Sequence, residues 1–424
     1  MKNTSNGATN PKGYPIVVAL TYSMFFMFAM TTDAVGEIIR IVKAEMSLTN
    51  TEASLFHWAT MIGIALSGML LGFLADRIGR KKTIILGLSL YGAASALFAG
   101  WASFSWYLSL LFVSGLAIGV FKTAILALIG DIATSTSDHT RRMNANEGFF
   151  ALGAIVGPLL VTTLDKQGLS WVWLYLIAAS MCAVMIIAAA LTSYPESIVE
   201  AKAVSVDKRS TDQRSGLLTS ISLIGNPYAL GFSIAIALYV ACEVSIFVWA
   251  PTLFADYVGT KSAMWIATYA VTIFFVLRAV GRFAAVWLLG FVDWKIVMVL
   301  FTGAICACFV ASSLFGKDAA VFSLPLSGLF MSMIYPTLNS KGISCLPKSR
   351  HGAVAGLILF FTAVSAAFAP LAMGYVADVI GGGNMQAGFY LATVFSIFLL
   401  LFSITNLVLD PAGRVLMSAD QSEY

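Results

Sequence analysis

The sequence predicts an all-α membrane protein with 12 transmembrane helices in two pseudo-symmetric six-helix bundles. Three observations lead to this fold class: the composition, the recurrence of long apolar segments, and the similarity between the two halves of the chain. The 424 residues are 59% hydrophobic and only 11% charged, against roughly 25% charged residues in soluble domains. A soluble core is therefore a poor fit. The net charge of +4 is too small to suggest a nucleic-acid partner.

Apolar segments long enough to cross a bilayer, about 20 residues each, recur along the whole chain. Twelve can be drawn, at 14–36, 54–75, 82–101, 105–131, 144–164, 171–193, 228–254, 262–290, 296–314, 319–340, 352–379 and 386–409. The longest polar interruption follows the sixth segment. We therefore expect a cytoplasmic N-terminal tail (1–13), a first bundle (14–193), a cytoplasmic linker (194–225), a second bundle (226–409) and a cytoplasmic C-terminal tail (410–424).

The distribution of Lys and Arg predicts the orientation. Most of the 25 basic residues fall in loops on the side of both termini, and only five fall in loops on the opposite side: Arg40, Lys43, Lys166, Lys261 and Lys317. The positive-inside rule then places both termini in the cytoplasm, and an even number of spans also requires them on one side. We expect a multi-pass plasma-membrane protein, in the inner membrane of a bacterium. The polar first 13 residues lack the pattern of a cleaved signal peptide.

Two pairs of segments relate the two halves. "VSGLAIGVFKTA" (113–124) matches "LSGLFMSMIYPT" (326–337), and "GPLLVTTLDKQG" (157–168) matches "APLAMGYVADVIG" (369–381). The fourth span therefore corresponds to the tenth, and the fifth to the eleventh. Internal repeats of this kind are typical of secondary transporters, whose substrate site lies between the repeats near the membrane midplane.

The loop "GFLADRIGRKKT" (72–83) joins the second and third spans. Its spacing resembles the signature loop of the major facilitator superfamily. We expect Asp76, Arg77 and Arg80 to form a cytoplasmic gate together with Asp131, which ends the fourth span. The alternative interpretation is a tight basic turn that only follows the positive-inside rule.

Longer segments resemble the fucose-galactose-glucose proton symporters of that superfamily. They are "SLTNTEASLFHWATMIG", "LYVACEVSIFVWAP", "VGRF" and "TLNSKGISCLPKSRHGAVAG". The resemblance covers nearly the whole chain and implies alternating access with proton-coupled uptake of a small sugar. One position departs from it: Lys122 stands where the fucose permease carries an acidic residue. The role in proton handling that is associated with that acid is therefore not transferred to this chain.

Ionisable side chains at bilayer depth carry a large free-energy cost, so they usually face a cavity or a charged partner. Asp33 ends the apolar part of the first span, either as a carboxylate in a transport path or as an interfacial group. Glu37, one turn on, is expected to be interfacial. Lys122 lies deep in the fourth span, where it either forms a structural salt bridge with Glu147 or Asp33 or contacts the substrate.

Three further charges belong to the same group of candidates. Glu147 opens the fifth span, as a helix-start acid or as a gating or substrate residue. Glu243 and Arg278 lie near the middle of the seventh and eighth spans and would form a buried pair, whereas Arg282 is expected to be structural. We expect proton coupling to involve Asp33, Glu147 and Glu243.

Aromatic and polar side chains would complete a sugar site, because aromatic faces stack on sugar C–H groups and hydroxyls need paired donors and acceptors. The predicted substrate-binding residues are Tyr22, Asp33, His57, Trp58, Lys122, Tyr239, Glu243, Trp249, Arg278, Tyr335 and Asn339. Each aromatic has the alternative of a role in packing or at the membrane interface.

The leading functional prediction is a proton-coupled sugar importer. The second is a symporter of an anionic sugar acid or another small carboxylate, with Lys122 and Arg278 as its cations. The third is a drug or metabolite exporter, suggested by "GAIVGP" in the fifth span. The sequence contains no nucleotide-binding loop, catalytic triad or metal-ligand spacing. We therefore expect no enzymatic activity, no cofactor and no metal, and a monomer whose partners are substrate, protons and membrane lipid.

Overall fold

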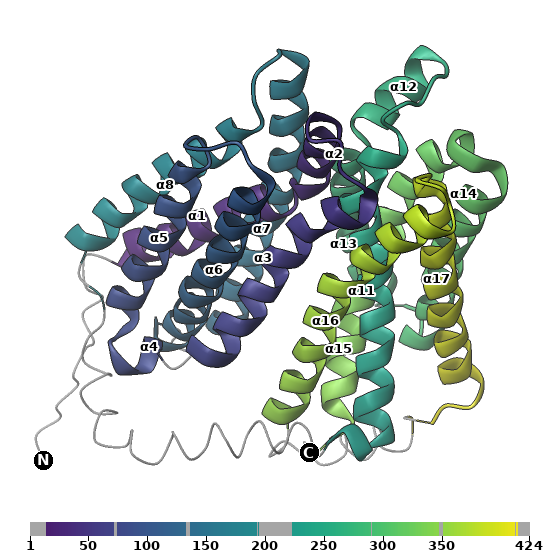
Figure 1. The fold of residues 1–424 in the computed structure, drawn as a ribbon. Coiled ribbons are helices and arrows are strands. Elements are labelled where there is room, and N and C mark those ends of the chain that lie inside the picture. Colours follow the sequence, from purple (N-terminus) through teal and green to yellow (C-terminus); the bar gives the residue numbers. More distant parts are fainter. Residues whose placement is uncertain are drawn as a thin grey trace, which may run out of the picture.

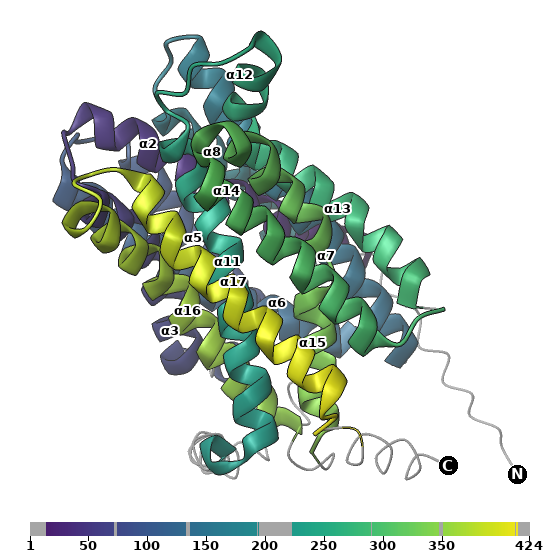
Figure 2. The same ribbon diagram turned by 90° about the vertical axis from the view of Figure 1, so that its right-hand side faces the viewer.

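The computed structural model describes residues 14–71, 74–132, 136–192, 194, 223–289, 291–346, 351–411 and 413. In these ranges the chain consists of helices joined by short connections (Figures 1 and 2). The all-α prediction is therefore confirmed for the described part of the chain. The predicted linker and the two predicted tails lie mostly outside the described residues.

The helices of the first half follow the predicted spans closely, with one exception. They are α1 (Tyr14–Thr32), α2 (Val35–Glu45), α3 (Asn50–Leu71), α4 (Leu74–Arg77), α5 (Arg80–Leu97), α6 (Phe104–Ile132), α7 (Thr136–Lys166) and α8 (Val172–Leu191). The exception is the first span, which is interrupted at Asp33 and Ala34 and then continues as α2. The break places the Asp33 backbone between two helices.

The second half contains two further departures from straight spans. Its elements are a 3-10 turn (Leu223–Gly225), α11 (Pro227–Leu253), α12 (Lys261–Thr268), α13 (Ala270–Leu289), α14 (Trp294–Met331), α15 (Ile334–Ser344), α16 (His351–Val379) and α17 (Met385–Val408). The predicted eighth span is bent by 76° between α12 and α13. The predicted tenth span is interrupted at Ser332 and Met333, between α14 and α15. The break of α14 at Gly316, whose φ of 69° few residues other than glycine adopt, lies between the predicted ninth and tenth spans.

Eight of the helical segments within the described ranges are long and apolar enough to cross a membrane, and the bent pair α12–α13 is a ninth candidate. One of these segments runs over 51 residues, Trp294–Ser344, and includes the break at Gly316. About 20 residues suffice for one crossing, so this segment is long enough for two. The count of twelve spans in two bundles stays a prediction.

Figure 1 shows α1 to α8 on one side of the molecule and α11 to α17 on the other. We call the end of the helices that carries α2 and α12, at the top of Figure 1, the outer end. The positive-inside rule, applied to the Lys and Arg residues of the loops, predicts that this end faces the outside of the cell. Three helix pairs join the two halves: α3 with α16, α2 with α11, and α7 with α13.

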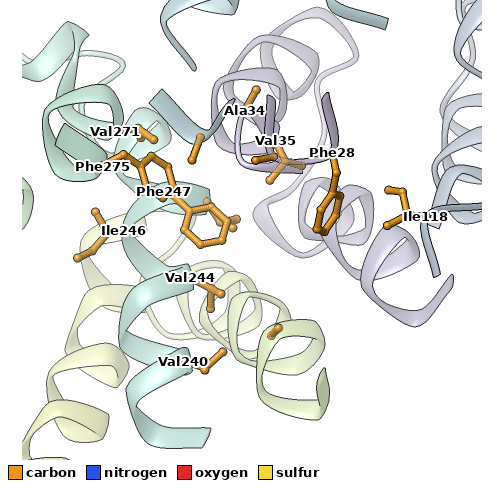
Figure 3. Close-up of a cluster of buried hydrophobic side chains, with 14 of the residues drawn as sticks. Phe28, Ala34, Val35, Ile118, Val240, Val244, Ile246, Phe247, Val271 and Phe275 are labelled. Atoms are coloured by element: carbon orange, nitrogen blue, oxygen red, sulfur yellow. The ribbon is translucent and has the colours of Figure 1, made fainter. Parts of the chain in front are cut away.

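A buried apolar cluster fills the seam between the halves near α2 and α11. Figure 3 shows Val35 of the first half between Phe28, which lies beside Ile118, and Phe247 and Phe275 of the second half. Gly36 makes the approach of α2 to α11 possible, because a Cβ atom at this position would lie 1.9 Å from the carbonyl oxygen of Phe247. The two backbones therefore touch where a side chain has no room.

We expect Gly36→Ala to destabilise this form of the protein by about 1–3 kcal/mol, the usual cost of overpacking a tight contact. Thermal unfolding of the purified protein in detergent would measure the change. Gly225→Ala is the matched control, since no atom lies within 4 Å of a Cβ at that position. Equal unfolding midpoints for both variants would contradict the tight contact between α2 and α11.

Candidate functional site

Asp33 lies at the break between α1 and α2, with a buried side chain. Its backbone N–H donates to the carbonyl of Ala29 at 3.0 Å, and the residue is only 8% exposed. Among the described residues no hydrogen-bond donor reaches its Oδ2 atom. A buried carboxylate oxygen without a donor is uncommon. It is the kind of position at which a proton or a ligand hydroxyl can bind.

A buried ion pair from the second half lies near Asp33. The guanidinium Nη1 of Arg278, on α13, contacts Oε1 of Glu243, on α11, and the two side chains are 18% and 13% exposed. The pair is the one that the sequence predicted. Arg278 also interacts electrostatically with Asp33, so its charge is shared between the two halves of the chain.

Lys122 supplies the corresponding cation from the first half. Its Nζ atom lies 4.8 Å from the ring centroid of Phe28, within cation–π range. It interacts electrostatically with Glu147, on α7, and with Asp33. Small residues bring a neighbouring helix close to this part of α6: α3 packs so closely on it that a Cβ at Gly115 would lie 2.3 Å from the Thr60 carbonyl oxygen.

These five residues form what we call the charge cluster: Asp33, Lys122, Glu147, Glu243 and Arg278. They come from five different segments of both halves. Each cation has an acidic partner in its own half, and both cations also interact with Asp33. Arg278 interacts more weakly with Glu147 of the first half as well. With three acids and two bases, the fully ionised cluster carries one excess negative charge. At low dielectric such a charge calls for a proton or a cation.

Two of the predicted aromatic residues are fully buried and bonded to backbone. The hydroxyl of Tyr239 donates to the Met331 carbonyl at 3.0 Å, and the indole N–H of Trp249 donates to the Pro370 carbonyl at 3.0 Å. Both side chains are 0% exposed. In this conformation they pack the second half together and are closed to a ligand.

Three other predicted residues, Tyr22, Tyr335 and Asn339, are more open. Tyr22, on α1, stacks on Phe149, on α7, with ring centroids 4.7 Å apart. Tyr335, on α15, lies 6.3 Å from the Tyr239 ring and is partly exposed, as is Asn339 one turn further along the same helix. Tyr22 and Tyr335 thus present aromatic surface from the two halves.

His57 and Trp58 lie on α3 at the seam with the second half. His57 is 1% exposed and meets the edge of the Phe247 ring at 5.8 Å, while Trp58 meets Phe368 at 6.4 Å. His57 also lines a cavity of about 10 Å³, roughly the space that one water molecule requires. The cavity is too small for a sugar. His57 is therefore enclosed here, whereas Trp58 is partly exposed.

The predicted gating residues are only partly described. Arg80, at the start of α5, pairs with Asp131 at the end of α6, with Nε and Oδ2 2.9 Å apart. Arg77 is exposed on α4, and the side chain of Asp76 lies outside the described part of the chain. The structure thus brings together the predicted partners Arg80 and Asp131; their gating role stays a prediction.

The structure shows the partners of two further acids. Glu37 is only 5% exposed, because it faces Arg40 at 3.3 Å, which in turn pairs with Asp165 at 2.5 Å. Its position at the membrane interface stays a prediction. Asp378, which the sequence reading did not select, accepts several hydrogen bonds from the start of α3. Its only signal in the sequence is its place in "APLAMGYVADVIG", the segment that matches the one containing Asp165.

Comparison with known proteins gives three related findings. Residues 17–370 match the profile of the Major Facilitator Superfamily. The L-fucose-proton symporter of Escherichia coli K12 is 24% identical over 405 residues, covering 88% of this chain and 90% of the relative. A glucose/galactose transporter of Brucella abortus is 25% identical over 390 residues, with the same coverage. The crystal structure of the E. coli fucose:proton symporter FucP superimposes with a TM-score of 0.61 at 21% identity, covering 92% of this chain and 98% of that one.

Proposed function

Because the chain belongs to the Major Facilitator Superfamily, and is thus a multi-pass membrane transporter and not an enzyme, we propose that it couples uptake of a small sugar to protons by alternating access. The charge cluster is the observation that carries this proposal. The relatives named for fucose and for glucose and galactose support the sugar. Twelve spans in two bundles, with both termini in the cytoplasm, are part of the proposal.

Asp33 is the proposed proton carrier, since it interacts with both cations and has a buried carboxylate oxygen that no donor reaches in the described part of the chain. When Asp33 is ionised, Lys122 in the first half and Arg278 in the second are both attracted to it. When it is protonated, Lys122 retains Glu147 and Arg278 retains Glu243, and each pair lies within one half. Protonation thereby removes an attraction that crosses the seam, so the halves can rock more freely.

In this scheme Glu147 is the counter-ion of Lys122 and Glu243 is the counter-ion of Arg278. Both acids contribute to proton coupling through these two cations. The sugar would bind between the halves, with aromatic faces from Tyr22 and Tyr335 and polar contacts from Asn339. Four other predicted residues would hold the helices around the site in place, because they contact neighbouring helices in this conformation. They are His57, Trp58, Tyr239 and Trp249.

A second candidate function, transport of a sugar acid or another small carboxylate, has its own supporting observation. The Nε atom of Arg278 is buried and has no hydrogen-bond partner in the described part of the chain. A guanidinium with a spare donor suits a carboxylate ligand. Lys122 would add a second cation nearby, at the position where the fucose permease carries an acid.

Uptake into proteoliposomes with an alkaline interior tests both candidates. Radiolabelled fucose, glucose and galactose would be compared with glucuronic and galacturonic acids, with and without the pH gradient. We expect accumulation of at least one neutral sugar, dependent on the gradient and abolished by a protonophore. Accumulation of the acids alone would favour the second candidate. Transport of neither class would contradict both and leave the exporter prediction.

A further inference from the structure

The start of α3 meets the end of α16 at the outer end, and a single carboxylate holds them together. Oδ1 of Asp378 accepts hydrogen bonds from the backbone N–H of Asn50 at 3.1 Å and from its side-chain amide at 2.7 Å. Oδ2 accepts from the backbone N–H of Thr51 at 2.7 Å and from its hydroxyl at 2.6 Å. Both oxygens are thus saturated by donors from the other half of the chain.

Asp378 caps the N-terminus of α3, although it lies on α16 in the other half of the chain. The first N–H groups of a helix have no partner within it, and an anion placed there also interacts favourably with the helix dipole. Asp378 satisfies two of those groups in α3. The Asn50 amide reaches further, to the Gly383 carbonyl at 3.1 Å, so the turn after α16 is tied to the same point.

The backbones also approach too closely for a side chain. A Cβ atom at Gly374, one helical turn before Asp378, would lie 2.8 Å from the carbonyl oxygen of Asn50. The hydrogen bonds and the backbone contact therefore form together and must break together when α3 and α16 separate.

The acid of the matching segment in the first half has a different partner. Asp165, one position before the place that corresponds to Asp378 when the prolines of the two segments are aligned, pairs with Arg40 of its own half. On that side the halves are joined instead by the neighbouring Lys166, whose Nζ lies 3.2 Å from the Tyr269 hydroxyl and 4.4 Å from the Tyr269 ring centroid. Of the two acids in the matching segments, Asp378 is the one that bridges the halves.

We propose that Asp378 is an outer-gate residue: its cap on α3 holds the outer end closed, and release of the cap is required for the outward-open state. The inference rests on the proposed alternating access but not on the identity of substrate or coupling ion. In the outward-open state the carboxylate and the start of α3 would be bonded to water. Hydrogen bonds to an ionised group are the stronger class, so losing them shifts the balance between the two states.

The test measures exposure of the seam from outside, without any substrate. A cysteine introduced as Ala366→Cys on α16 lies beside His57 of α3 and is 9% exposed. The native cysteines are replaced by serine or alanine, and a membrane-impermeant maleimide is added to intact cells. In this background we expect Asp378→Asn to raise the labelling rate about fivefold or more, the lower end of typical coupling between conformational states.

Asp318→Asn is the matched control. It removes another carboxylate, which accepts a hydrogen bond from the Tyr257 hydroxyl at 3.0 Å within the second half, so the labelling rate should not change. If Asp378→Asn does not fold, the double variant Asn50→Ala/Thr51→Val removes the partner side chains and leaves the carboxylate in place; we expect increased labelling there too. Parental labelling in a folded variant of either kind would overturn the gate role, whatever the sugar assay shows.

Discussion

Asp33→Asn is expected to abolish sugar accumulation against a gradient while leaving exchange of sugar across the membrane. An amide has nearly the same shape as a carboxyl group and can still pair with sugar hydroxyls, but it does not take up a proton in this pH range. A pH gradient of one unit is worth about 1.36 kcal/mol, enough for about tenfold accumulation with one proton per sugar. We expect the variant to fall from that ratio to about one.

The measurement compares two assays on the same proteoliposomes: gradient-driven uptake, and counterflow of labelled sugar into vesicles preloaded with unlabelled sugar. Glu37→Gln is the control, since it neutralises the other buried carboxylate of this segment, whose partner is Arg40 and not the charge cluster. Full accumulation by Asp33→Asn would show that the proton is carried elsewhere. Loss of counterflow as well would point to a binding defect and remove the support for a separate proton step.

The helices were predictable because span length and apolar content decide them locally. α11 and α17 begin within a residue of the predicted spans, and each start has a local cause: Asn226 and Asn384 accept hydrogen bonds from the first turns of these helices. The breaks were not predictable in the same way. The interruption at Asp33 and the 76° bend before Ala270 depend on how neighbouring helices pack, which a hydropathy pattern does not contain.

Site residues were predictable where a charged side chain stands in an otherwise apolar span. Glu243 and Arg278 stand out in apolar sequence, and their pairing follows from their depth. Asp378 does not stand out, because an acid at the end of a span is ordinary and two of its partners are backbone N–H groups that no residue type marks. The burial of Glu37 was not predictable either: Arg40 and Asp165 cover it, and Asp165 lies far away in the sequence.

Arg278→Met is expected to have the largest effect on stability. The substitution keeps most of the side-chain volume but leaves Glu243 buried without its counter-ion. Breaking a buried pair by removing one partner costs about 3–5 kcal/mol. We therefore expect a clearly lower unfolding midpoint for the purified variant in detergent, measured by thermal or denaturant unfolding. Arg282→Met, one turn along α13, is the control for loss of a basic residue from the same helix and should be far milder.

The double variant Arg278→Met/Glu243→Met separates charge from packing. Replacing both members of a buried pair by apolar side chains is often neutral or stabilising, so most of the stability lost in Arg278→Met should return. Transport should not return, because Asp33 would then have lost its cation in the second half. A double variant as unstable as the single one would show that Arg278 acts through packing. One that is stable and still accumulates sugar would remove Arg278 from the coupling mechanism and leave Lys122 as the cation that Asp33 requires.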